Sequence, residues 1–141
     1  MWLAVTKRML TVVWSIELSV RDYECDLQGI VNNAVYQNYL EHARHQYLQA
    51  HGVDFAQLTA QGIHVVMTQA ELSYRQSLRP NDWFQVTVAV APLGRLRAVF
   101  TQQIIRADGQ LMLAAEITVA ALNPAGKPMP AMAILPNRAL S

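Results

Sequence analysis

The sequence predicts an α+β fold in which one long helix packs on a curved antiparallel sheet of about five strands. Helical spacing of apolar residues extends over one long stretch, from about Asn33 to Ala50. Alternation of apolar and polar residues, typical of strands, precedes that stretch and dominates after Gly62. The later connections are too short for helical crossovers, so we expect consecutive strands to be antiparallel neighbours.

The first half of the chain should form a strand, a loop and two helices. An apolar face with a period of two predicts a strand over residues 12–20, and residues 22–32 follow as a loop. The long helix then spans about five turns. Its apolar stripe consists of Tyr36, Tyr39, Leu40, Ala43 and Tyr47. Asp54 is expected to cap a second, short helix that Gly62 ends.

The second half should contain only strands and turns. The strands are expected at His64–Arg75, Trp83–Ala91, Arg95–Ala107 and Gln110–Leu122. Turn residues separate them, and Asp108-Gly109 is the strongest hairpin signal. From Asn123 onward four prolines predict a closing loop.

Composition limits the classes of protein to consider. A chain of 141 residues fits one domain over residues 1–141, with residues 1–10 as a loosely ordered extension. Its residues are 52% hydrophobic and 15% charged, so we expect part of the surface to be buried in a homodimer or homotetramer. Open edges of the sheet favour the same association. A net charge of +1 without a basic block argues against nucleic acid as a partner.

The expected location is the cytoplasm. Cys25 is the only cysteine, so no intrachain disulfide can form and a reducing compartment is the simpler interpretation. The apolar run Leu10–Trp14 is too short for a signal peptide core, and no later run reaches the length of a membrane span. We therefore expect no membrane association.

The segment Asp26–Tyr36 is the most informative part of the chain. Asp26 precedes Gly29 by three residues, and a helix begins shortly behind them. Free main-chain N–H groups and the helix dipole at such a start can hold an anion beside the carboxylate. A base or nucleophile next to an oxyanion site suits hydrolysis of an activated acyl group. An aspartate before a helix is also an ordinary capping residue, and the pattern alone leaves both interpretations open.

The run from Val20 to Tyr36, continued by Tyr39–Arg44, resembles the signature of hotdog-fold thioesterases of the 4-hydroxybenzoyl-CoA thioesterase type. It is closer still to the acyl-acyl carrier protein thioesterases of plant plastids and their bacterial relatives. A second match is Leu72–Arg75 through Leu78–Asp82. The resemblance covers about residues 12–122 and implies a hotdog fold and hydrolysis of acyl-CoA or acyl-carrier-protein thioesters.

The resemblance also implies roles for individual residues. Asp26 matches the catalytic aspartate, which attacks the thioester carbonyl or activates water. The main-chain N–H of Asn33 matches the group that binds the oxyanion. Gly29 belongs to the same motif, where we expect it to border the substrate. No metal or organic cofactor is implied. A fatty or β-ketoacyl group is favoured, and an aromatic group such as a dihydroxynaphthoyl ester stays open.

Other residues offer alternatives. Glu41 is a second candidate acid, because some hotdog thioesterases use an acidic residue on this helix; a solvated glutamate is the simpler interpretation. Cys25 has no neighbouring base and is expected to be a buried thiol. His42 and His45 lie three residues apart, but Arg44 stands where a metal site in a helix bundle would need a histidine after Glu41.

Two further binding roles and one alternative function remain open. Tyr36 could line the acyl pocket or simply belong to the core. Arg79, Arg95 and Arg97 lie near predicted turns, where they could contact a phosphorylated pantetheine carrier or be isolated surface residues. A non-catalytic acyl-binding protein or a dehydratase could use the same scaffold. The absence of histidine between Asp22 and Leu40 disfavours dehydration.

Overall fold

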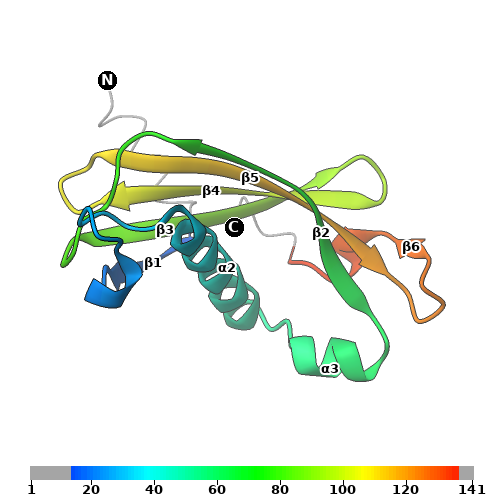
Figure 1. Ribbon diagram of the computed structural model, residues 1–141. Helices are drawn as coiled ribbons and strands as arrows, with labels where there is room; N and C mark the ends of the chain where they lie inside the picture. The colour runs from blue at the N-terminus through cyan, green and yellow to red at the C-terminus, as the bar shows by residue number, and fades with distance from the viewer. Residues whose placement is uncertain (1–13, 137–141) are drawn as a thin grey trace.

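The computed structural model describes residues 14–136, in which one long helix lies against one face of a six-stranded antiparallel sheet (Figure 1). The strands are β1 (Trp14–Ser19), β2 (His64–Tyr74), β3 (Trp83–Leu93), β4 (Arg97–Arg106), β5 (Leu111–Leu122) and β6 (Pro128–Met129). The helices are α2 (Asn33–Ala50), α3 (Phe55–Ala60) and the short 3-10 turns η1 (Asp22–Glu24) and η2 (Ala131–Ala133). The expected α+β architecture is confirmed.

The order of strands is β1-β3-β4-β5-β2, with β6 beside the end of β5. Consecutive strands β3, β4 and β5 are antiparallel neighbours, as expected. The same expectation is wrong for β2 and β3, because β2 pairs with β5 at the opposite edge. These two strands still run in opposite directions, so the link over residues 75–82 crosses one end of the sheet without a helix. Leu78 is completely buried in that link.

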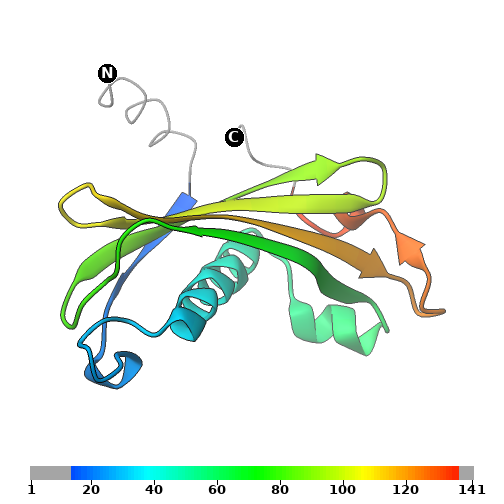
Figure 2. The same cartoon turned by 45° about the horizontal axis from the view of Figure 1, so that its top comes forward.

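Helix α2 forms where the sequence predicts it and packs mainly against β1 and β3. The Asn32 side chain caps its start by accepting a hydrogen bond from the Ala34 N–H (3.1 Å). All five residues of the expected apolar stripe are buried against the sheet. Figure 2 shows the helix crossing one face of the twisted sheet, whose opposite face carries no described helix.

The short helix α3 begins at the expected cap. Asp54 accepts hydrogen bonds from the N–H groups of Ala56 and Gln57, and Gly62 turns the chain after the helix with a φ of +79°. The region after Asn123 is more than the expected loop, because Pro128–Met129 pairs with β5 and η2 follows. The expectations for residues 1–13 lie outside the described part of the chain.

Candidate active site

Asp26 lies in a hydrogen-bonded loop that leads into α2. Cys25 and Val31 form an antiparallel bridge, and the Asp26 N–H donates to the Ile30 carbonyl (2.9 Å). The Gly29 N–H donates to the Asp26 carbonyl (3.0 Å), and Asp26 Oδ1 accepts from the Gln28 N–H (2.8 Å). These contacts hold the loop in a tight turn and leave the Asp26 side chain exposed to solvent. The carboxylate is therefore positioned and accessible.

Beside this loop, the start of α2 offers one exposed N–H to which residues 14–136 provide no acceptor. The N–H of Asn32 donates to the Glu24 carbonyl (3.1 Å), and those of Ala34 and Val35 donate to the side chain and the carbonyl of Asn32. Asn33 is the first helical residue, so it has no acceptor within the helix. Among residues 14–136, no turn or cap hydrogen bond uses its N–H either. This group, at the positive end of an 18-residue helix, is suited to bind an oxyanion.

The surroundings of Cys25 disfavour a role as a nucleophile. Partial burial raises the pKa of its thiol, and the nearby carboxylates of Asp22, Asp26 and Glu24 raise it further. A nucleophilic cysteine requires the opposite shift. Its Sγ lies 4.0 Å from the Arg21 carbonyl, so the thiol is turned toward its own loop.

Gly29 supplies the backbone conformation that the loop needs. Its φ of +76° lies in the left-handed region, and a Cβ there would meet nothing within 4 Å. The turn between Asp26 and the helix start thus requires a residue that adopts a positive φ easily. The space beside Gly29 is open to a ligand.

Tyr36 is built into the core one turn after the helix start. Its side chain is 2% exposed, and its hydroxyl accepts a hydrogen bond from the Leu78 N–H (2.9 Å). Burial raises the pKa of this phenol. Its ring meets Tyr74 edge-on, with centroids 5.5 Å apart. With 2% of the residue exposed, Tyr36 belongs to the core and offers a substrate almost no surface in this chain.

The three arginines considered as a phosphate site do not come together. Arg79 lies in the link before β3, whereas Arg95 and Arg97 lie at the opposite end of that strand. A strand of eleven residues separates them by about 35 Å. Arg79 itself is exposed, at the end of the sheet where Leu78 contacts the Asp26 loop.

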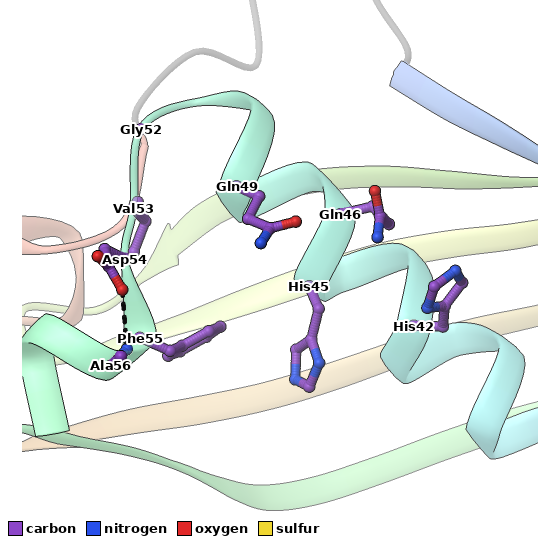
Figure 3. A pocket seen from close by; sticks show the side chains of 9 residues that line it. All are labelled: His42, His45, Gln46, Gln49, Gly52, Val53, Asp54, Phe55 and Ala56. Carbon is purple, nitrogen blue, oxygen red and sulfur yellow. Dashed lines mark hydrogen bonds between the residues drawn. The ribbon is translucent and has the colours of Figure 1, made fainter.

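His42 and His45 border a groove of about 620 Å³ between α2 and the start of α3 (Figure 3). His45 packs edge-on against Phe55, with ring centroids 5.3 Å apart, and Asp54 is occupied in capping α3. Across the described residues, no group of three histidine, cysteine, aspartate or glutamate side chains is arranged to hold a metal ion. Likewise, no described helix is long and apolar enough to cross a membrane.

Sequence reasoning missed a polar cluster beneath α2. Gln102 is completely buried; its Nε2 donates to the Leu40 carbonyl (3.1 Å) and its Oε1 accepts from Arg44 Nη1 (2.9 Å). Arg44 also lies over the Phe100 ring, 6.0 Å from its centroid. The available signal was a glutamine at an inward position of a strand otherwise filled by Ala98, Phe100 and Ile104.

Comparison with curated proteins finds thioesterases. The chain is 34% identical over 95 residues to the chloroplastic acyl-acyl carrier protein thioesterase ATL3 of Arabidopsis thaliana, covering 67% of this chain and 50% of that protein. It is 26% identical over 111 residues to the acyl-CoA thioester hydrolase YbgC of Escherichia coli, covering 79% and 81%. The chain thus spans about half the length of the Arabidopsis relative.

Solved structures share the fold. A DHNA-CoA thioesterase of Staphylococcus aureus superposes with a TM-score of 0.76 at 24% identity, covering 84% of this chain and 80% of that one. A hypothetical protein of Aquifex aeolicus superposes with a TM-score of 0.79 at 25% identity, covering 87% and 99%. The expected hotdog fold is confirmed.

The model of the Thioesterase-like superfamily matches residues 20–132, which include the Asp26 loop, both helices and the strands β2 to β5. The match extends over most of the chain and agrees with the resemblance carried by the Asp26–Tyr36 motif. The chain belongs to the Thioesterase-like superfamily.

Proposed function

We propose that this protein hydrolyses acyl thioesters of CoA or acyl carrier protein to the free acid and the thiol. The observation that carries the proposal is the exposed Asn33 N–H at the start of α2, which has no acceptor among the described residues and lies next to the loop that exposes Asp26. The superfamily match and the relatives named acyl-acyl carrier protein thioesterase and acyl-CoA thioester hydrolase support it.

The chemistry requires few groups. Asp26 attacks the thioester carbonyl or removes a proton from a water molecule that attacks it, and the carbonyl oxygen becomes an oxyanion. The Asn33 N–H and the helix dipole stabilise that charge. The carbon–sulfur bond then breaks, and the thiolate leaves without needing a strong acid because it is a good leaving group. Where Asp26 itself attacks, water then hydrolyses the resulting acyl–Asp26 anhydride, so either route consumes one water molecule for each thioester.

We also propose that two copies pair through β2. This strand of eleven residues has no described neighbour on its outer side, and most of its residues are exposed. A long unpaired edge strand with exposed apolar residues such as Val66, which is 38% exposed, is a liability in an isolated chain. A twofold axis beside β2 would join two sheets into one. Light scattering on the purified protein should give twice the mass of one chain, and a monomer at all concentrations would contradict the pairing.

The test of the enzymatic proposal is Asp26→Asn. The amide keeps the shape of the side chain and can still accept the Gln28 N–H, but it lacks the charge. We expect kcat for acyl-CoA hydrolysis to fall by about a hundredfold or more, with little change in KM. Asp22→Asn is the matched control, because Asp22 is also exposed and lies four residues earlier.

The possible outcomes distinguish failure of the enzymatic proposal from failure of the role assigned to Asp26. Wild-type protein that is inert on a broad panel of acyl-CoA and acyl-carrier-protein substrates would refute the enzymatic proposal. An Asp26→Asn variant as active as wild type would refute only the role of Asp26. A single turnover in heavy-oxygen water identifies covalent attack if the label enters Asp26, because that requires an acyl–Asp26 anhydride that water opens at the aspartyl carbon.

A further inference from the structure

An exposed strip of apolar side chains lies between α2 and the edge strand β2. Val65, Met67, Leu72 and Tyr74 pair with inward-facing residues of β5, so they lie on the same face of the sheet as α2. The helix packs mainly against β1 and β3 and leaves this side of the face uncovered. Met67 and Tyr74 are consequently about half exposed.

The strip connects the candidate active site to the second half of α2. At one end, Tyr74 contacts Tyr36, one turn after Asn33. At the other end, Val65 and Met67 line a cavity of about 290 Å³. The other apolar side chains around this cavity are Leu48, Phe55, Phe100 and Val119. Arg44 also lines it, eleven residues or about 16 Å along the helix from Asn33.

Arg44 places a charged guanidinium among the apolar side chains that line this cavity. Burial lowers the pKa of its guanidinium and the charge of Glu41 raises it. Gln102 accepts a hydrogen bond from one N–H of Arg44, whereas a guanidinium has five N–H donors. Neither of the two ion pairs found within residues 14–136 involves Arg44. Its remaining donors therefore have no carboxylate partner in the described chain.

We propose that the acyl group of the substrate lies along the strip and that Arg44 donates a hydrogen bond to a neutral oxygen, a hydroxyl or carbonyl, near its far end. This inference rests on the proposed hydrolysis of acyl thioesters. An acyl group with an apolar end would desolvate the N–H groups of Arg44 that Gln102 does not accept from and give them no acceptor, which is costly. A carboxylate end would lie close to Glu41, which also lines the cavity. A hydroxyl satisfies both, since it accepts from Arg44 and can donate to Glu41.

The test compares acyl-CoA substrates of equal chain length that end in a methyl, a hydroxyl or a carboxylate. For wild type we expect kcat/KM to be about tenfold higher for the hydroxyl than for the methyl end, mostly through KM, and higher than for the carboxylate. Arg44→Met should abolish the preference for the hydroxyl end, and kcat/KM for the methyl-ended substrate should not fall, because the variant removes the charge that an apolar end would desolvate. Arg44→Lys should retain part of the preference.

Arg95→Met serves as the matched control, because Arg95 is exposed at the distant β3–β4 turn. It should keep the wild-type preference. An active wild-type enzyme without preference for the hydroxyl end would overturn the inference and leave the proposed hydrolysis intact. So would an Arg44→Met variant that loses activity on all three substrates equally, since that pattern indicates a structural role. Wild-type protein inert on every substrate would overturn both.

Discussion

Replacing Gln102 with methionine should destabilise the protein by about 3 kcal/mol. Methionine has nearly the shape of glutamine, so the completely buried site should stay filled. The loss comes from Arg44 Nη1, which would lose its acceptor; a hydrogen bond from a charged group contributes about 1.5–3 kcal/mol. The bond to the Leu40 carbonyl adds about 1 kcal/mol, although that carbonyl keeps its helical donor.

The decisive measurement is a double-mutant cycle by urea denaturation, at one protein concentration because association shifts apparent stability. Arg44→Met alone should cost about 2 kcal/mol, since it strands the Gln102 oxygen. The double variant Arg44→Met, Gln102→Met should lie within about 1 kcal/mol of wild type, far below the sum of the single changes. Gln85→Met, on the exposed face of β3, should change stability by less than about 0.5 kcal/mol. Additive losses would refute the reasoning that Gln102 is present to satisfy Arg44.

Three further results are expected. Because the pKa of Cys25 is raised, its thiolate is scarce at neutral pH; iodoacetamide should modify it more slowly than a free thiol in rate measurements across pH, and Cys25→Ala should keep hydrolysis. Gly29→Ala should cost about 1 kcal/mol in denaturation experiments and lower kcat, since φ is +76° in the turn that carries Asp26. Asp54→Ala, which removes two cap hydrogen bonds, should cost about 1 kcal/mol without altering kcat.

Local patterns were sufficient to predict the two α-helices and the five long strands, but not β6 or η2. The stripe from Tyr36 to Tyr47 and the cap at Asp54 depend on neighbours along the chain, and both helices form where those signals occur. Within the described residues, the strand bounds agree within about two residues for the same reason. The position of β2 could not be predicted from its own residues. Pairing with β5 or with β3 would expose the same alternating pattern, and the choice depends on contacts far apart in the chain.

The candidate site also contains residues that a local pattern identifies and residues that only the fold brings together. Asp26, Gly29 and the helix start are close in sequence, and a motif of consecutive residues identifies them. Arg44 and Gln102 are 58 residues apart, so only the folded sheet brings them together. Arg79 and Arg95 show the converse, because similar turn contexts in the sequence correspond to opposite ends of β3. A lone polar residue at an inward position, such as Gln102, is the signal that sequence reasoning can use for buried polar partners.

The link that breaks the expected strand order also fixes the candidate active site. Because β2 lies at the far edge, residues 75–82 must cross the end of the sheet, and this crossing brings Leu78 under the start of α2. There the Leu78 carbonyl accepts from the Val31 N–H (2.9 Å), two residues before Asn33, and its N–H donates to Tyr36. The helix start that carries Asn33, the proposed oxyanion donor, is thus held from both sides by one buried residue of the crossing link. A β2–β3 hairpin would not cross the end of the sheet. The strand order that the sequence patterns did not predict therefore anchors the Asp26–Tyr36 segment, which those patterns identified best.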